Sequence, residues 1–410
     1  MTVKQQWYKS WSLVSLEDLA VSEKGSIRRG PFGGSLKKEI FVDDGYLVYE
    51  QQHAIADDFS LGRYFINEAK YKEMEGFDVL PDDLIISCAG TIGKIAIAPN
   101  NSRPGIINQA LMRIRPDQNK VLPIYLKRYL ESPVAQREIF SKSSGSALKN
   151  LVAISEIKKS KIPLPPLEEQ KRIAAILDKA DRIRRKRQEA IRLTEELGRS
   201  IFLDMFGDPV TNPKGWEIVS MKSIVKQTQY GTSEKSNTER QGIPVLRMNN
   251  LTYKGDLDLH DIKWCEISEK DYEKYTVKKG DLLFNRTNSP ELVGKTAVWN
   301  ISDEYAFAGY LVRVRFNESK ANSEYASAYL NSSHGKKYLS SKAKASINMS
   351  NFSASEFVKI PILLPSIDLQ NQFKLIKEEL ESKKGKVEEF YFESENLFNS
   401  LLQRAFRGEL

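Results

Sequence analysis

The sequence has few of the residues that build metal centres and disulfide scaffolds. Only two cysteines, Cys88 and Cys265, and three histidines occur among 410 residues. The cysteines are far apart and form no CxxC pair, so we interpret them as small buried apolar residues of a protein in a reducing compartment. No two histidines have a metal-ligand spacing, and no HExxH motif occurs. These absences disfavour a zinc site and a disulfide-stapled secreted fold.

Long apolar segments are absent as well. No stretch approaches the ~18 consecutive apolar residues of a membrane-spanning helix. The N-terminal segment Met1–Tyr8 lacks the apolar core of a signal peptide. We therefore expect a soluble cytoplasmic protein that has no membrane partner.

Motifs of stand-alone enzymes are also missing. An adenine methyltransferase would carry an Asn/Asp-Pro-Pro-aromatic motif, which Asp208-Pro209-Val210 does not match. Gly294-Lys295-Thr296 resembles the end of a phosphate-binding loop, but Ser289 replaces the required glycine, so a turn between strands is the better interpretation. Pro81-Asp82 and Glu156-Ile157-Lys158 match fragments of a nuclease motif, but such short matches are expected by chance in a chain with 28% charged residues. We predict no catalytic residue and no metal ligand.

The composition is that of a folded protein with a basic excess. With 40% hydrophobic residues, long disorder is disfavoured. A chain of 410 residues is long enough for two or three domains. The formal net charge is +8, from 62 Lys and Arg against 54 Asp and Glu. This balance modestly favours a polyanionic partner, most often nucleic acid.

The chain repeats itself with a period of about 200 residues. Short segments recur in the same order at a near-constant offset. The matched pairs are Trp11-Ser-Leu-Val-Ser with Trp216-Glu-Ile-Val-Ser, Asp83-Leu-Ile-Ile with Asp281-Leu-Leu-Phe, Gly93-Lys94 with Gly294-Lys295, Leu111-Met-Arg-Ile-Arg with Leu311-Val-Arg-Val-Arg, Tyr125-Leu-Lys-Arg-Tyr-Leu with Tyr325-Ala-Ser-Ala-Tyr-Leu, and Leu164-Pro-Pro-Leu-Glu-Glu-Gln with Leu364-Pro-Ser-Ile-Asp-Leu-Gln. The repeat predicts the order globule, helix, globule, helix.

Two long helices are predicted, over residues 167–206 and about 366–407. Each would be ~60 Å long at ~1.5 Å per residue. Their apolar stripes are Ile173, Ile176, Ala180, Ile183, Ala190, Leu197 and Ile201 in the first, and Phe373, Ile376, Leu380, Val387, Phe390, Leu397, Leu401 and Phe406 in the second. We expect the two helices to pack against each other as an antiparallel coiled coil, with the globules at its two ends.

The globules are predicted to be mixed. Short apolar runs predict strands, and the segment 123–141 predicts a helix. The predicted strands of the first globule are 46–49, 83–87, 95–98 and 111–115. The fold class is therefore α+β.

Polar side chains at the predicted loops suit DNA recognition. Arg and Lys pair with guanine O6 and N7, whereas Asn and Gln pair with adenine N6 and N7. The candidates in the first globule are Arg29, Ser35, Lys37, Gln51, Gln52, His53, Thr91, Lys94, Asn108, Gln109 and Lys149. The candidates in the second are Thr232, Lys235, Arg247, Asn249, Asn250, Arg286, Asn288, Lys295, Lys344 and Asn348.

These loops differ between the globules although the framework matches. Gln51-Gln52-His53 stands where the second globule has Arg247-Met248-Asn249. A duplicated scaffold with different polar tips is what recognition of two different half-sites requires. The competing interpretation for any single residue is an ordinary solvated loop. For the basic run Arg182–Arg187 we favour a solvated helix face with i,i+4 pairs over a contact with DNA or a partner.

Several motifs resemble one family. Pro163-Leu-Pro-Pro-Leu-Glu-Glu-Gln170, followed by a long helix ending in Phe202-Leu-Asp-Met-Phe206, resembles the central conserved region of the specificity subunits of type I restriction–modification enzymes. Asp83-Leu-Ile-Ile-Ser, Gly90-Thr-Ile-Gly-Lys94 and the C-terminal Ala405-Phe-Arg-Gly-Glu-Leu410 resemble the same family.

The resemblance implies an architecture and a set of partners. Residues 1–165 and 208–363 would be target-recognition domains, each reading half of a bipartite site in double-stranded DNA. Residues 166–207 and 364–410 would be the coiled-coil helices, which set the spacer between half-sites and dock two methyltransferase subunits. The methyltransferase would use S-adenosylmethionine, and separate motor–nuclease subunits would use ATP and Mg. This chain would hold no cofactor.

Two alternatives stay open at this point. One is a DNA-binding nuclease, against which the missing motifs count. The other is a coiled-coil scaffold that does not read sequence, against which the divergent loop tips count.

Overall fold

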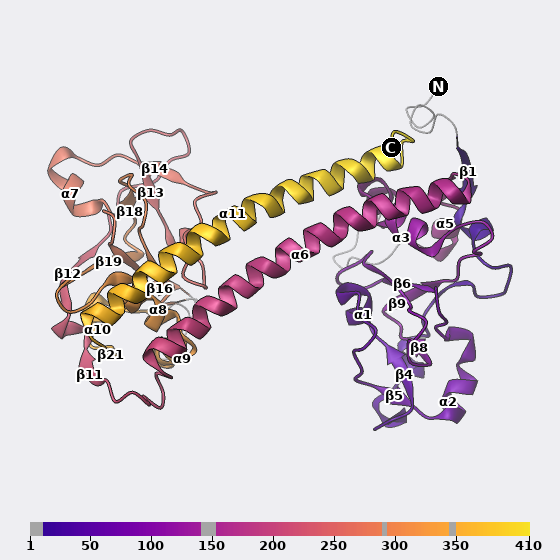
Figure 1. The fold of residues 1–410 in the computed structure, drawn as a ribbon, viewed down its shortest axis with the longest axis horizontal. Helices are drawn as coiled ribbons and strands as arrows, with labels where there is room; N and C mark the ends of the chain where they lie inside the picture. Colours follow the sequence, from indigo (N-terminus) through magenta and orange to yellow (C-terminus); the bar gives the residue numbers. More distant parts are fainter. Residues whose placement is uncertain (1–10, 141–152, 289–292, 344–349) are drawn as a thin grey trace. The chain divides into compact units, whose positions relative to one another are not determined.

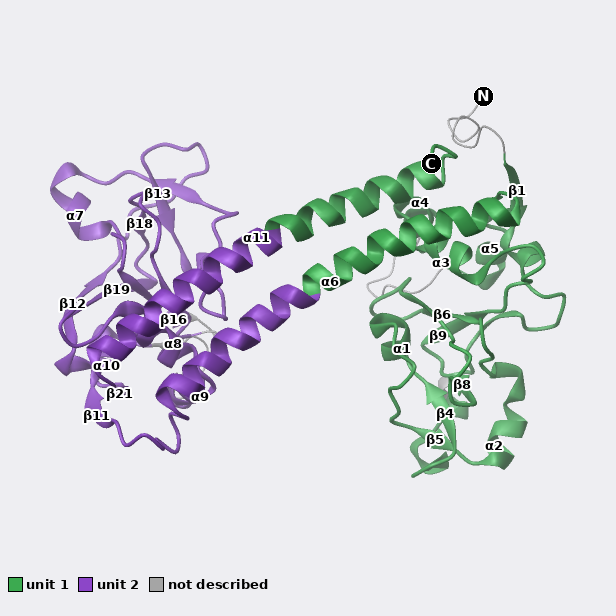
Figure 2. Ribbon diagram, in the orientation of Figure 1, with its two compact units in different colours: residues 1–188, 389–410 green, residues 189–388 purple. Residues whose placement is uncertain are grey.

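The computed structural model describes residues 11–140, 153–288, 293–343 and 350–410. These residues form two compact units (Figure 2): unit 1 comprises residues 1–188 and 389–410, and unit 2 comprises residues 189–388. Both long helices contribute to both units. They are α6 (Leu167–Phe206) and α11 (Ile367–Ala405), so the two predicted helices are confirmed.

Unit 1 contains two four-stranded sheets and a ribbon (Figure 1). The first sheet is antiparallel in the order β2 (Ile27–Arg29), β9 (Leu111–Ile114), β6 (Leu84–Ser87) and β7 (Ile95–Ile97). The second has the order β3 (Phe41–Val42), β5 (Phe65–Ile66), β4 (Tyr46–Tyr49) and β8 (Gly105–Ile107), and β4 and β8 run parallel. The ribbon pairs β1 (Ser12–Ser15) with β10 (Lys161–Leu164). Strands were thus correctly predicted at β4, β6, β7 and β9, whose apolar runs are buried.

Unit 2 repeats this topology with modifications. Its four-stranded sheet has the order β12 (Val225–Tyr230), β19 (Leu311–Phe316), β15 (Leu282–Asn285) and β17 (Thr296–Val298). A three-stranded sheet contains β14 (Lys263–Cys265), β13 (Ile243–Leu246) and β18 (Ala306–Phe307), with β13 and β18 parallel. Two ribbons pair β11 (Glu217–Ser220) with β21 (Pro361–Leu364), and β16 (Thr287–Asn288) with β20 (Ser350–Asn351).

The remaining elements are short. The helices of unit 1 are α1 (Gln51–Ala56), α2 (Glu68–Glu73), α3 (Pro123–Glu131), α4 (Pro133–Ala135), the π-helix η6 (Gln136–Phe140) and α5 (Ile154–Lys158). Those of unit 2 are α7 (Tyr272–Tyr275), α8 (Ser323–Asn331), α9 (Ser333–Ala343) and α10 (Ala354–Phe357). The 3-10 turns are η2 (Leu16–Leu19), η3 (Gly33–Ser35), η4 (Lys38–Ile40), η5 (Glu75–Phe77), η7 (Met221–Ser223), η8 (Met248–Asn250) and η9 (Glu269–Asp271).

The single helix predicted over 123–141 is wrong in one respect, because it breaks at Ser132. Ser132 has an extended backbone, with φ −64° and ψ 148°, and its hydroxyl accepts a hydrogen bond from the amide of Ala135. Ser332 breaks the corresponding helix of unit 2 in the same way and accepts from the amide of Gly335. A serine that caps a new helix start competes with continuation of the old helix.

Each unit has its own core, to which both long helices contribute. In unit 1, Ile173 and Leu177 of α6 are buried together with Leu402 of α11 and with Phe406, which directly follows α11. The ring of Phe406 lies 5.2 Å from the ring of Tyr129. In unit 2, Phe202 and Phe206 of α6 pack with Phe373 of α11, and the ring of Phe206 lies 4.6 Å from that of Tyr325. The aromatic end of each helix therefore closes the core of the unit opposite to the one in which that helix begins.

The two long helices run antiparallel within each unit (Figure 1). In unit 1, Arg184 of α6 pairs with Glu395 of α11 at 3.1 Å, and Arg187 farther along α6 contacts Phe390 earlier in α11. In unit 2, Glu195 pairs with Lys384 at 3.3 Å. Residue numbers rise in α6 as they fall in α11, so the antiparallel prediction is confirmed.

The predicted apolar seam is wrong at its middle positions. Ile183 is 41% exposed, Leu197 49% and Leu397 56%. Near the middle, Arg184 of α6 pairs with Glu395 of α11, and Asp181 of α6 pairs with Arg128 of α3. The helices are apolar toward each other mainly where they enter the two cores.

Candidate nucleic-acid interface

The two units share a framework of buried polar contacts beneath the candidate loops. In unit 1, Asp83 accepts two hydrogen bonds from Arg115, at 2.9 and 2.8 Å, and one from the amide of Leu80. In unit 2, Asp281 accepts two from Arg315, at 2.7 and 3.0 Å, and one from the amide of Lys278. A buried carboxylate is tolerated where such bonds satisfy it.

A second shared contact explains the Leu-Pro-x-x-x-x-Gln motif. The Gln170 amide nitrogen donates to the carbonyls of Lys120 and Pro165, and its oxygen accepts from the amide of Leu122. Gln370 makes the same three bonds with Lys320, Pro365 and Asn322. Each glutamine is fully buried and fixes the start of a long helix to its unit.

In unit 1, the best-placed candidates gather around α1 and the turn after β6. Gln51 and Gln52 begin α1, directly after β4; Gln52 is exposed and Gln51 half-buried. A Cβ atom at Gly90 would lie 3.6 Å from the Gln51 amide nitrogen, so this glutamine reaches the turn that carries the exposed residues Thr91 and Lys94.

A second group in unit 1 lies near β2. The Arg29 guanidinium donates to the carbonyl of Gln109 at 3.4 Å, and both residues are exposed. Asn108 beside them accepts a hydrogen bond from the amide of Ala110 through its side-chain oxygen and so shapes the turn. Ser35 and Lys37 follow β2 and are exposed.

In unit 2, the counterpart of α1 is the turn η8. Both elements follow the strand that pairs in parallel within the second sheet, β4 in unit 1 and β13 in unit 2. Arg247 and Asn249 lie here; the Arg247 guanidinium pairs with Asp261 at 2.7 Å, and Asn249 is exposed. A six-residue helix that presents glutamines in one unit is thus a three-residue turn that presents arginine and asparagine in the other.

Arg286 follows β15, and its guanidinium lies 4.8 Å from the centre of the Tyr230 ring. The corresponding residue after β6 is Cys88, which is fully buried. The two positions correspond because the Cys88 amide donates to the carbonyl of Ala110 and the Arg286 amide to that of Tyr310. Burial raises the pKa of the Cys88 thiol to about 12, so this thiol stays protonated.

Four of the candidates are buried. The Nδ1 atom of His53 accepts from the Glu50 amide, and its Nε2 contacts the Leu61 carbonyl at 2.8 Å. Asn250 bonds the amide of Arg247 and the carbonyl of Asp258. The four are His53, Thr232, Asn250 and Lys295. The sequence alone did not distinguish these buried residues from exposed loop residues, because polar residues next to strands occur in both environments.

The other candidates have simpler placements. Lys235 is exposed. For Asn288 only the backbone, in β16, is described. Lys149, Lys344 and Asn348 lie outside the described residues. One charged residue near the tips of unit 2 was not among the predicted candidates: Lys336 of α9, which aligns with the neutral Gln136.

The basic run on α6 is largely engaged within the chain. Arg184 and Arg185 both pair with Asp181, and Arg185 also pairs with Asp57 at 3.1 Å. Arg182 and Lys186 are exposed. The favoured interpretation, a helix face with local ion pairs, holds for Arg184 and Arg185.

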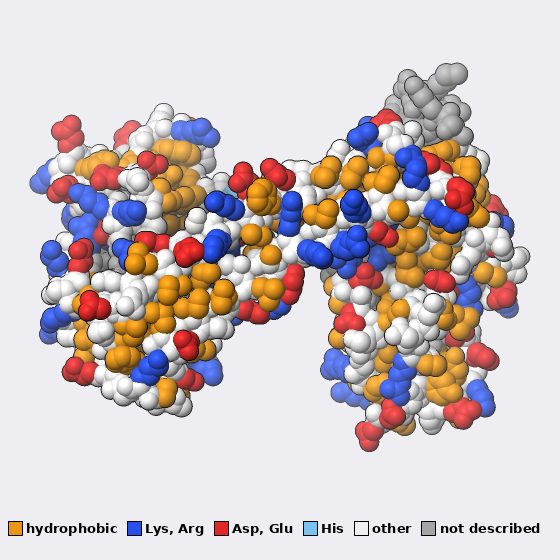
Figure 3. Space-filling view, viewed as in Figure 1, with side chains coloured by type: hydrophobic (Ala, Val, Ile, Leu, Met, Phe, Trp, Pro, Cys, Tyr) orange, Lys and Arg blue, Asp and Glu red, His pale blue; other side chains and the backbone are white. Residues whose placement is uncertain are grey.

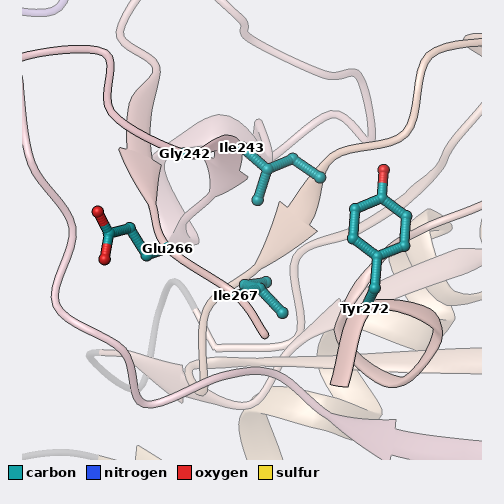
Figure 4. A pocket seen from close by; sticks show the side chains of 5 residues that line it. All are labelled: Gly242, Ile243, Glu266, Ile267 and Tyr272. Carbon is teal, nitrogen blue, oxygen red and sulfur yellow. The ribbon is translucent and has the colours of Figure 1, made fainter. Parts of the chain in front are cut away.

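A hollow of about 460 Å³ in unit 2 is lined by Gly242, Ile243, Glu266, Ile267 and Tyr272 (Figure 4). Figure 4 shows the carboxylate of Glu266 on the side away from the Tyr272 ring. Among the described residues, no group of three or more His, Cys, Asp and Glu side chains is arranged to hold a metal ion. Nor does any helix in these ranges combine the length and apolarity needed to cross a membrane.

Comparison with known proteins shows to which family this duplicated framework belongs. The model of the type I restriction modification DNA specificity domain matches residues 35–193 and again residues 213–382. The chain belongs to this specificity family. The two matches coincide with the two copies of the repeat, so each unit carries one family domain.

Curated relatives belong to the same family. The EcoKI specificity subunit of Escherichia coli (strain K12) is 25% identical over 305 residues, which cover 70% of this chain and 65% of that protein. The chain thus spans slightly less than two thirds of that relative. The MjaVIII specificity subunit of Methanocaldococcus jannaschii is 23% identical over 439 aligned positions, covering 99% of both chains.

Solved structures of the specificity family show the same fold. The S subunit of a type I restriction–modification system from M. genitalium covers 97% of this chain and 96% of its own, with a TM-score of 0.56 at 14% identity. A chain from a study of complex assembly and conformational transition of the type I R-M system covers 98% and 99%, with a TM-score of 0.54 at 19% identity.

Proposed function

We propose that this chain is the DNA-recognition subunit of a type I restriction–modification enzyme, in which each unit reads one half of a bipartite site in double-stranded DNA. The observation that carries the proposal is the contrast within the repeat. The hydrogen bonds of Asp83 and Asp281 are alike in the two units. The polar residues of the corresponding loop elements differ: they are Gln51 and Gln52 at α1 in unit 1, and Arg247 and Asn249 at η8 in unit 2. Glutamine suits adenine and arginine suits guanine, so the two half-sites should differ in base composition.

The long helices are proposed to dock the catalytic partners. Large apolar side chains stay exposed on them in both units, and Figure 3 shows apolar side chains at the surface. They are Ile183, Phe390, Phe392 and Leu397 in unit 1, and Leu193, Leu197, Leu203, Leu375 and Ile376 in unit 2. Large apolar side chains that stay exposed in number on one element are candidates for a protein interface. Because each unit has such a set, we propose two methyltransferase subunits, one for each unit.

Catalysis is proposed to reside in the partners. The methyltransferase would bind S-adenosylmethionine, and the motor–nuclease subunits would bind ATP and Mg. This chain would recognise the DNA sequence and fix the position of the complex on the DNA. Phosphate contacts by Lys and Arg would give much of the affinity and make it depend on salt.

The test is selection of bound sequences from a random duplex library, with the chain co-purified with its methyltransferase. Two unlike half-sites separated by a fixed gap are expected. A single contiguous motif would mean that one unit does not read DNA. No enrichment at all would contradict the proposal and favour a scaffold that does not read sequence.

A further inference from the structure

Two lysines of unit 2 lie at Gly294 with no carboxylate partner among the described residues. Lys295 follows Gly294 in the turn between β15 and β17, and its ammonium donates to the carbonyl of Met248 at 2.6 Å. Lys336 of α9 donates to the carbonyl of Gly294 at 3.4 Å, and its ammonium lies 4.7 Å from the centre of the Tyr253 ring. In the described part of the chain, neither lysine forms an ion pair with a carboxylate.

This arrangement is electrostatically unfavourable in the free protein. Burial lowers the pKa of Lys295. Burial and, to a smaller extent, the positive charge of Lys295 lower the pKa of Lys336 to about 8. Two neighbouring, partly desolvated ammonium groups, whose described partners are carbonyls and an aromatic ring, gain stability when an anion joins them.

Unit 1 demonstrates that the framework does not need this charge. There Gln136 occupies the position of Lys336, and its amide nitrogen donates to the carbonyl of Gly93 at 3.1 Å. Gly93 and Gly294 both have positive φ, 81° and 80°, so the glycine whose carbonyl accepts the hydrogen bond has a similar φ in both units. A neutral amide therefore makes the structural hydrogen bond as well as the ammonium does, and the positive charge of Lys336 is an addition specific to unit 2.

The lysine pair is linked directly to the recognition turn of unit 2. The carbonyl that Lys295 binds belongs to Met248, which lies between Arg247 and Asn249 at the start of η8. An ammonium group has three N–H donors, and the single hydrogen bond described for each lysine leaves donors for an incoming anion. DNA bound with its base edges toward η8 presents backbone phosphates beside that turn.

We propose that Lys295 and Lys336 bind one backbone phosphate of the DNA half-site that unit 2 reads. The inference rests on the proposed function and deepens it, since it assigns a backbone contact to one of the two units.

The first experiment uses the substitution that unit 1 itself suggests, Lys336→Gln, in the full chain co-purified with its methyltransferase. Binding to a duplex with both half-sites is measured as a function of salt. We expect affinity to fall on the order of tenfold, and the slope of log K against log salt to become shallower by about one. Because a phosphate contact does not distinguish bases, the preference for the correct half-site should be unchanged.

Thermal unfolding separates this role from a structural one. Loss of an uncompensated charge should leave the melting temperature of the Lys336→Gln variant equal to or above that of the wild type, even though the variant binds DNA more weakly. The matched control is Lys337→Gln, which removes an exposed charge from the adjacent position of α9 and should leave the salt slope unchanged. An equal decrease in affinity and slope in both variants would overturn the assignment.

The second experiment locates the phosphate. Neutral methylphosphonates are placed one at a time along the half-site of unit 2. One position should cost the wild type more than Lys336→Gln does, because it removes the contacts of both lysines. The same position should cost the Lys336→Gln variant less than it costs the wild type, because only the contact of Lys295 is left to lose. A Lys336→Gln variant with wild-type affinity and slope would overturn the phosphate site alone. A wild-type protein with no sequence preference would overturn the proposed function instead.

Discussion

Unit 1 and unit 2 share several buried hydrogen bonds but differ in the polar side chains of their loops. Gln170 and Gln370 make the same three hydrogen bonds, and Tyr125 and Tyr325 donate to equivalent strand carbonyls at 2.7 Å. At the tips, by contrast, a six-residue helix in unit 1 corresponds to a three-residue turn in unit 2. Side chains that hold the fold are constrained by packing and buried hydrogen bonds, whereas tip residues are free to differ, which is how one scaffold can read two sequences.

The largest expected effect comes from the shared carboxylates. Asp83→Ala and Asp281→Ala each remove the buried carboxylate that pairs with Arg115 or Arg315, and each should destabilise its own unit by about 3–5 kcal/mol. Asp281→Ala should cost more, because Arg113 and Arg115 of unit 1 also pair with Asp78. Hydrogen exchange followed separately in each unit measures this. Equal effects in both units would show that Asp78 does not compensate.

A break in α6 should affect both units together. Ile183→Pro removes a backbone hydrogen bond in mid-helix and should cost about 3 kcal/mol or more. We expect it to abolish co-purification with the methyltransferase. The control is Ile183→Ala, which keeps the helix at a half-exposed position and should have a much smaller effect on stability. Normal assembly of the proline variant would contradict a docking role for the helix.

Substitutions at the tips should separate the units. Gln51→Ala with Gln52→Ala should relax the bases selected in one half-site, by about 1–3 kcal/mol for each bidentate pair of hydrogen bonds to a base that the substitution removes. Arg247→Ala with Asn249→Ala should do the same for the other half-site only. Library selection with each variant measures both. If either pair altered both half-sites, the assignment of one half-site to each unit would be wrong.

The smallest expected effect is a pH dependence confined to unit 2. The pKa of Lys336 is lowered to about 8, and a bound phosphate would favour its charged form. Affinity should therefore be constant below pH 8 and decline as the pH rises above it, by at most about tenfold. Among the described residues, the groups that face this ammonium are Lys295 and the ring of Tyr253. The Lys336→Gln variant should lack the decline, and an identical decline in that variant would contradict the prediction.

Much of the fold was predictable because its signals are local or repeated. The periodicity and absence of proline over 167–206 predicted α6, and the apolar runs predicted β4, β6, β7 and β9. The break at Ser132 was missed because a serine cap depends on the hydrogen bond that it makes with Ala135. The predicted boundaries at 165, 207 and 363 remain predictions; the compact units combine parts of those segments.

Candidate site residues were less predictable than the elements that carry them. Glutamine at 51 and 52 and arginine at 247 and 286 could be proposed from residue type and position. Whether a polar residue faces solvent or is buried depends on its neighbours in space. The ring of His53, for example, contacts the Leu61 carbonyl and lies 5.1 Å from the ring of Tyr49. Lys336 could have been found by aligning it with Gln136, since a charge that replaces a neutral residue within a repeat is a visible signal.

By itself, the sequence determined the duplication, the two long helices and the family, because these rest on residue order, periodicity and motifs that need no third dimension. Only the tertiary structure decided that Phe206 and Phe406 close the cores of the opposite units, that the middle of the helix pair is joined by charges, and that Lys295 and Lys336 meet at one glycine turn. Each of these joins residues far apart in the chain, and such contacts are set by which surfaces are left to bury once the local elements have formed.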